Sequence, residues 1–179
     1  DIIGFLIIFP ISRRYIFNKF IGKIKKKDTL GNVKFDSIII ADFDESLKSV
    51  TTSLLYTDIS PKEKYFITLN QWFDKSLLKE ISSQPIYFPS INKKNYEIFS
   101  LEYFEKFNQY PNQLSFLSYD LLGLVYYLIL QNNSTIDEKI FTKKTLFKGK
   151  VGIFEIKNNK INHILNFYKV EDEKFKKIF

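Results

Sequence analysis

The pattern of apolar and polar positions is clearest over residues 35–73, and the rest of the chain is organised around this stretch. Ser37 to Ala41 is a short apolar run rich in Ile and closed by acidic residues, which is typical of a strand buried on both faces. The next apolar residues recur at helical spacing: Leu47, Val50, Leu54 and Leu55. The pattern predicts a strand over 37–41, a helix over 45–56 and a strand over 65–69, an order that implies a right-handed parallel crossover and an α/β fold.

The amino-terminal residues leave three interpretations open. Ile2 to Ile11 is strongly apolar, but a helix needs about 20 residues to cross a bilayer, and Pro10 ends this run. A buried strand is favoured over the tail of a truncated segment or an interfacial anchor. Residues 12–34 are predicted to form a basic helix followed by a loop.

Three further elements are predicted in the middle of the chain. Residues 85–90 are predicted to form a brief strand, and Pro89 favours a sheet edge or an exit of the chain toward another layer, because proline lacks the N–H that a central ladder needs. Residues 95–107 carry aromatic side chains at helical spacing. Residues 114–130 are apolar almost all round, which predicts a helix buried between layers, and Asp120 and Gly123 argue against a membrane span.

The carboxyl-terminal part is predicted to be β-structure. Residues 150–156 and 161–170 flank the pair Asn158-Asn159, which tolerates positive φ and fits a hairpin turn. Residues 175–179 are predicted to add a short final strand.

Composition excludes some chemistry. The net charge is +7, but the lysines are dispersed, so no nucleic-acid partner is expected. The chain has no Cys and one histidine, His163, which removes disulfides, thiolate metal sites and multi-histidine sites. It also has no Met, so we expect a processed chain or a fragment.

One local pattern points to an enzyme. The apolar strand followed by Asp42 and Asp44 resembles the opening motif of haloacid-dehalogenase-type phosphatases, in which the first Asp attacks phosphorus, and carboxylates at a strand end also suit Mg²⁺. That family also uses a later Lys and an acidic pair near the same metal, and no such strand with an acidic pair is evident downstream. We therefore expect no catalytic residues, no cofactor and no metal.

A longer series of motifs resembles the carboxyl-terminal half of type I periplasmic binding proteins, above all penicillin-binding protein activators and Leu/Ile/Val-binding relatives. The motifs occur in the family's order: Phe35-Asp36 before the first strand, Tyr110-Pro111, Tyr119-Asp120-Leu121, and residues 147–154, FKGKVGIF. Leu121 stands where the family usually has Ala, and Val151 where Thr is common. The resemblance covers residues 33–179.

The resemblance implies part of a two-lobe α/β protein with a parallel three-layer lobe and a carboxyl-terminal antiparallel hairpin. It assigns residues 33–90 and 145–179 to the second lobe, and 91–144 to helices that pack toward a first lobe. Residues 1–32 match poorly and receive no chemistry.

Ligands of open α/β sheets gather beyond the carboxyl ends of the strands. The candidate binding residues at this edge, with two facing them from the other lobe, are Asp42, Phe43, Asp44, Asn70, Gln71, Trp72, Tyr119 and Asp120. Structural roles explain some of them equally well: Asp44 as a helix N-cap, Trp72 as core and Asp120 as a buried hydrogen-bond partner.

The resemblance implies a non-catalytic extracytoplasmic binding protein. A cell-envelope scaffold or sensor like the penicillin-binding protein activators is favoured over a solute-binding protein of an ABC transporter for amino acids or similar small polar solutes. The implied partners are an envelope protein or a small polar solute, and the implied location is periplasmic or outer-membrane-anchored. Membrane association is expected only through a lipoprotein anchor outside this sequence.

Overall fold

The computed structural model describes residues 5–8, 35–135, 137–142 and 144–179. The chain forms two compact units, one of Asp1–Pro89 with Phe167–Phe179 and the other of Ser90–Asn166. Contacts therefore group residues 145–166 with the preceding helices, and the assignment of segments to lobes of a larger protein stays a prediction. The predicted helix within 12–34 lies outside the described residues.

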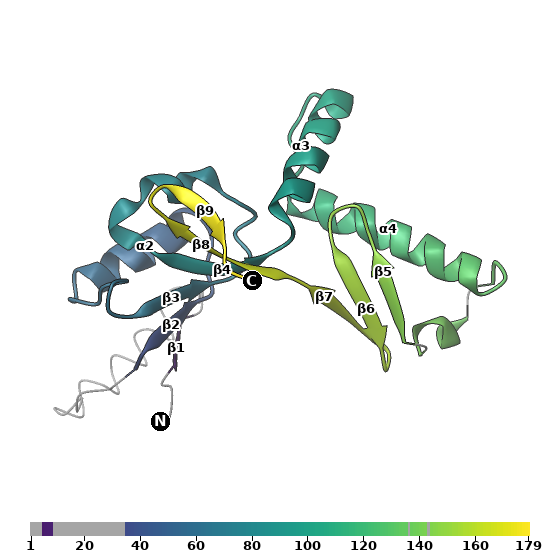
Figure 1. Cartoon of the computed structure of the whole chain (residues 1–179), viewed down its shortest axis with the longest axis horizontal. Helices are drawn as coiled ribbons and strands as arrows, with labels where there is room; N and C mark the ends of the chain where they lie inside the picture. Colours follow the sequence, from purple (N-terminus) through teal and green to yellow (C-terminus); the bar gives the residue numbers. More distant parts are fainter. Residues whose placement is uncertain (1–4, 9–34, 136, 143) are drawn as a thin grey trace, which may run out of the picture. The chain divides into compact units, whose positions relative to one another are not determined.

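Unit 1 is built on a six-stranded sheet (Figure 1). Its spatial order is β1 (Phe5–Ile8), β2 (Ser37–Ile40), β3 (Tyr65–Thr68), β4 (Ile86–Ser90), β8 (Asn166–Glu171) and β9 (Lys174–Lys177). Strands β1 to β4 pair in parallel, and β8 and β9 form an antiparallel hairpin. The predicted parallel pairing of the strands at 37–41 and 65–69 is confirmed, with Ile38 opposite Phe66.

Helix α2 (Asp44–Leu55) connects β2 to β3, as the sequence predicts. Its residues Leu47 and Thr51 are buried, because an apolar stripe at helical spacing meets the sheet. The prediction that Asp44 caps this helix is wrong. Phe43 occupies the N-cap position, and Asp44 is the first helical residue, where its charge still favours the positive end of the helix dipole.

The short 3₁₀ helices η1 (Lys75–Lys79) and η2 (Ile81–Ser83) lead from β3 to β4. Of the two positions predicted for this strand, the sheet edge is wrong, since β4 lies between β3 and β8. The chain passes from unit 1 to unit 2 directly after Pro89. The register of β4 with β3 pairs Ile86 and Tyr87, so Pro89 follows the paired residues and its missing N–H removes no bond from that ladder.

Aromatic side chains fill the core where β4 meets β8. Phe88 is fully buried, stacks on Tyr168 with ring centroids 5.9 Å apart, and meets Phe73 and Phe175 edge to face. Such clusters combine large buried apolar area with favourable ring geometry. This cluster joins segments that are about 100 residues apart in the sequence.

Unit 2 contains the helices α3 (Lys93–Phe107) and α4 (Gln113–Gln131), the 3₁₀ helix η3 (Glu138–Phe141) and a three-stranded antiparallel sheet. The strands are β5 (Thr145–Lys148), β6 (Ile153–Lys157) and β7 (Lys160–Ile164). Asn158 and Asn159 form the β6–β7 turn with φ of 52° and 59°, which confirms the hairpin. The predicted strand over 161–170 divides instead into β7 and β8, which belong to different sheets.

Helix α4 corrects a further prediction. One side of it packs in unit 2 through Phe116, Leu124 and Leu128, but most of its other apolar side chains are exposed. A helix that is apolar all round is fully buried only if other elements cover every face, and unit 2 covers only one face of α4. In the part of the chain that the structure describes, α4 is the one helix long and apolar enough to cross a membrane, a test that core helices of soluble proteins also pass.

Replacing Phe88 by Ala is expected to lower the free energy of unfolding by about 3–5 kcal/mol, because it removes a fully buried ring and leaves a cavity in the aromatic cluster. Urea denaturation measures the change. Tyr56→Ala is the matched control, since Tyr56 is 86 % exposed and its truncation should change stability by less than about 0.5 kcal/mol. Equal effects of the two substitutions would contradict this core assignment.

Candidate functional site

The carboxyl ends of β2 and β3 carry a small hydrogen-bonded network. Gln71 is buried, and its Nε2 donates to the Asp42 carbonyl at 2.9 Å and to Thr68 Oγ1 at 2.9 Å. The Thr68 hydroxyl in turn donates to the Ile40 carbonyl at 2.9 Å. The structure thus brings Asp42 and Gln71 together, as the sequence predicts for neighbouring parallel strands, but the Gln71 amide donates to a backbone carbonyl and a hydroxyl of the protein itself.

The remaining candidates in unit 1 also make local bonds. The Asp42 carboxylate accepts from the Phe43 N–H at 2.9 Å, and Asn70 Oδ1 accepts from the Trp72 N–H at 3.0 Å. Phe43 and Trp72 are half-buried, and Asp44 is exposed. Short polar side chains often bond the backbone of the next residues in this way at strand ends.

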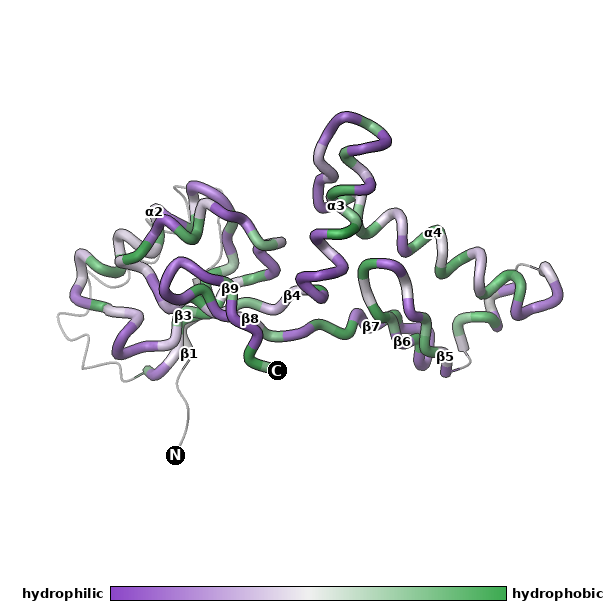
Figure 2. Tube along the Cα trace, turned by 45° about the horizontal axis from the view of Figure 1, so that its top comes forward, coloured by the Kyte–Doolittle hydropathy of each residue, from purple (hydrophilic) through white to green (hydrophobic). Residues whose placement is uncertain are grey.

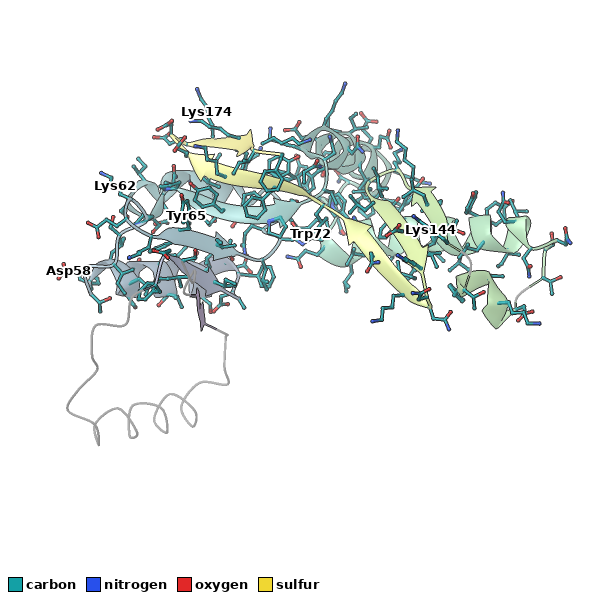
Figure 3. All side chains as sticks on the ribbon, turned by 60° about the horizontal axis from the view of Figure 1, so that its bottom comes forward. Asp58, Lys62, Tyr65, Trp72, Lys144 and Lys174 are labelled. Atoms are coloured by element: carbon teal, nitrogen blue, oxygen red, sulfur yellow. The ribbon has the colours of Figure 1, made fainter. Side chains whose placement is uncertain are left out.

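Backbone with positive φ occurs at this edge, as it does at several turns elsewhere in the chain. Asp44, Trp72 and Phe73 have φ of 49°, 49° and 57°, in the left-handed region that disfavours side chains with a Cβ. A left-handed residue costs roughly 1–2 kcal/mol, which the surrounding packing must offset. Strain of this kind is found at ligand sites and also at ordinary turns, so the edge formed by residues 42–44 and 70–73 stays the candidate site in unit 1 on the strand-end rule (Trp72 is labelled in Figure 3).

Tyr119 and Asp120 belong to unit 2, and that they face the unit 1 candidates across a cleft stays a prediction. Within unit 2 Asp120 is 2 % exposed and accepts three backbone hydrogen bonds. Its Oδ1 accepts from the Lys150 N–H at 2.9 Å, and its Oδ2 from the Val151 and Gly152 N–H groups at 3.0 and 2.6 Å. The need for a polar partner, inferred from sequence, is met by the turn between β5 and β6.

Two glycines allow this turn to approach its neighbours closely. A Cβ on Gly149 would lie 2.5 Å from the Asp120 carboxyl carbon, and a Cβ on Gly152 would collide with His163 Nε2. The side chain of Lys150 in this turn makes two further contacts. The Lys150 ammonium pairs with Glu102 of α3, which raises the pKa of Lys150, and lies 6.0 Å from the centre of the Tyr119 ring.

His163 lies against Gly152 of the same turn. Its ring stacks on Phe154 with centroids 4.4 Å apart, and its Nε2 is buried without a hydrogen-bond partner among the described residues. Burial lowers the pKa of His163 below its usual value of 6.5, although the Asp120 charge opposes the shift. The neutral imidazole is therefore the form that the folded unit accommodates.

Among the described residues the acidic side chains do not form a metal-binding group. Within residues 35–135, 137–142 and 144–179, no three His, Cys, Asp or Glu side chains are placed to hold a metal ion. Asp42 and Asp44 come directly after one strand, but a phosphatase also needs a cation and a second acidic pair around the transferred group.

Thr68 was not predicted from the sequence, and Gly149, Lys150 and Gly152 were noted only as part of the motif FKGKVGIF, without their contacts to Asp120 and His163. The spacing of the two glycines in FKGKVGIF was a usable signal, since a glycine pair at a strand end often marks close approach of another group. The partner of that turn, 30 residues earlier on α4, left no local signal.

No known protein family and no curated protein sequence matches the chain. The fold is nevertheless that of a periplasmic-binding-protein-like domain: a mainly parallel α/β unit interrupted by a helical unit with a small antiparallel sheet. A similar solved structure is the C-domain of LpoA (YraM) from Haemophilus influenzae, a regulator of PBP1A. The TM-score is 0.56 at 14 % identity, over 93 % of this chain and 51 % of that one, so the predicted fold class is confirmed and the chain spans about half the matched domain.

Replacing Asp120 by Ala is expected to destabilise unit 2 by at least about 3 kcal/mol, because three buried N–H groups lose their acceptor. Asp120→Asn should be intermediate, since it keeps one acceptor oxygen. Chemical denaturation measures both, and Asp58→Asn, at an exposed turn residue (Figure 3), is the control. A stable Asp120→Ala protein with unchanged amide-exchange protection at 150–152 would contradict the assigned role.

Stability is expected to fall as the pH drops from about 7 to 5. The unfolded chain takes up a proton on His163 near pH 6.5, whereas the folded state, with its lowered pKa, resists protonation, so stability is lost as pH falls through this window. His163→Gln should flatten the dependence in this range. Glu171 is the internal reference. Lys169 and Lys176 lower its pKa to about 2, so its contribution to the free energy of unfolding is lost only at more acidic pH.

Proposed function

We propose that this chain is a non-catalytic docking domain of the bacterial cell envelope that binds a peptidoglycan synthase, in the manner its similarity to a PBP1A regulator suggests. The observation that carries the proposal is the combination of that fold with polar groups that are bonded internally. Gln71 bonds the Asp42 carbonyl and the Thr68 hydroxyl, and Asp120 accepts three backbone N–H groups of its own unit.

Internal bonding favours a scaffold over a solute receptor. A site for a small polar solute needs buried donors and acceptors that the ligand satisfies, since unpaired buried polar groups are costly. The amide N–H groups of Gln71 and both carboxylate oxygens of Asp120 are already used, so a solute would have to replace existing hydrogen bonds. Docking to a protein depends more on surface shape and apolar anchors than on such groups.

The strained backbone at Trp72 and Phe73 favours a second candidate, an amino-acid-binding component of a transporter. Aromatic walls beside polar strand ends are common in small-molecule sites. For either function we propose a periplasmic or outer-membrane-anchored location, by resemblance.

Binding assays are expected to separate the two functions. The immobilised chain should retain a PBP1A-type synthase purified from the same organism, and amino acids should change neither its melting temperature nor the fluorescence of Trp72, its only tryptophan. Asp42→Asn should alter partner affinity at most. Saturable amino-acid-dependent fluorescence without synthase binding would favour the solute receptor, and Mg²⁺-dependent phosphatase activity abolished by Asp42→Asn would overturn both functions.

A further inference from the structure

The three-stranded sheet of unit 2 has one face that is turned away from α4. Side chains alternate between the two faces of a strand, and Phe147, Phe154 and Ile156 pack with α4 in the core. The residues between them form the opposite face, called here the outer face. Its members are Lys144, Leu146, Lys148, Ile153, Glu155, Lys157, Lys160, Asn162 and Ile164. All of them are exposed except Glu155, which is half-buried.

Positive charge is concentrated on the outer face. Residues 35–179 contain 19 lysines and 18 acidic residues, so this part of the chain is nearly neutral. Helix α3, for comparison, holds three lysines and three glutamates. The outer face holds four lysines and one acidic residue, Glu155. These lysines are dispersed in the sequence, and the pairing of the strands brings them onto one surface.

The strand register also places like charges together. Lys157 and Lys160 lie directly opposite each other on β6 and β7. Like charges at opposed positions of a sheet repel, which lowers its stability. The Glu155 carboxylate is 3.5 Å from the Lys144 ammonium, so the one acidic group of this face already has a cationic partner. An anionic partner would therefore relieve a repulsion that the fold itself leaves in place.

The rest of the outer face indicates the kind of anion. Leu146, Ile153 and Ile164 are 63, 37 and 49 % exposed, and Figure 2 shows hydrophobic and hydrophilic positions mixed along β5 to β7. A single-stranded nucleic acid would use aromatic side chains for stacking, and the nine residues of this face include none. Protein interfaces are depleted in lysine. Lysines mixed with aliphatic side chains suit a lipid surface, where the ammonium groups meet phosphates and the aliphatic groups enter the acyl boundary.

We propose that the outer face binds the headgroup layer of a bilayer that contains anionic phospholipid. The three strands lie about 4.8 Å apart, so the lysines can reach several headgroups at once (Lys144 is labelled in Figure 3). The contact is reversible, because a few lysines and three partly exposed aliphatic side chains fall far short of an inserted helix. It does not depend on docking to a synthase, so either function can fail without the other.

Vesicle flotation of the 179-residue chain tests the proposal. Wild type should float with vesicles of phosphatidylcholine that contain about 30 % phosphatidylglycerol, and it should not float with pure phosphatidylcholine. Binding should be lost at about 0.5 M salt, since salt screens the attraction between ammonium groups and phosphates.

Charge-neutralising variants locate the contact. The triple variant Lys148→Gln/Lys157→Gln/Lys160→Gln should lower the partition coefficient at least about tenfold, because each lysine contributes separately at an anionic surface. The matched control changes three exposed lysines outside the outer face, Lys62→Gln/Lys75→Gln/Lys94→Gln, and alters the net charge equally. It should bind within about twofold of wild type. Leu146→Gln should weaken binding about threefold by removing an aliphatic contact.

The triple variant should fold, because it removes the repulsion between Lys157 and Lys160, and circular dichroism checks this. If it does not fold, Lys148→Gln and Lys160→Gln alone should each lower binding about threefold. Absence of flotation with anionic vesicles would overturn the proposal. So would equal losses in the two triple variants, which would place the attraction in overall charge or in the basic run at 23–27. Binding of polyglutamate that anionic vesicles do not compete away would instead identify an acidic protein partner.

Discussion

The carboxylate of Asp120 is the interaction on which unit 2 depends. It accepts the N–H groups of Lys150, Val151 and Gly152, and so joins the first half of α4 to the turn between β5 and β6. A buried carboxylate is costly unless its oxygens are bonded, so helix and turn must form together. Glycines at 149 and 152 provide the necessary room, and the core of Leu124, Leu128, Ile140 and Ile156 continues along the same side of the helix.

This arrangement changes the interpretation of the motif residues. Tyr119-Asp120 and the glycine-containing turn are far apart in sequence, yet in the structure the Asp120 carboxylate binds the turn directly. Lys150 of the turn also forms a salt bridge with Glu102. Residues that recur in a family pattern near a cleft are easily assigned to a ligand. Here the hydrogen bonds of Asp120 account for its presence by folding alone, whereas ligand binding at residues 42–44 and 70–73 stays a prediction.

Local signals predicted much of the fold from the sequence. The Ile-rich run at 37–40, the helical spacing from Leu47 and the Asn158-Asn159 turn all describe short-range geometry, and the structure contains each of them. The errors concern tertiary packing. Pro89 indicated a sheet edge, but whether its missing N–H removes a ladder bond depends on the register of the strands, which the sequence does not show. How much of α4 is exposed depends on which neighbouring elements the chain supplies. Most of the candidate site followed from one rule about strand ends, but the partner of Asp120 lay in a turn 30 residues away.

The interruption of unit 1 by unit 2 has a consequence for synthesis on the ribosome. Residues 90–166 are contiguous and can fold as soon as they emerge, but the sheet that begins with β1 to β4 must wait for β8 and β9 at the end of the chain. Until then Phe88 lacks Tyr168 and Phe175, and the edge of β4 is open. A nascent chain therefore exposes an apolar strand throughout the translation of unit 2. Aggregation through this strand edge is most favoured in that interval, and a chaperone that covers the strand would prevent it.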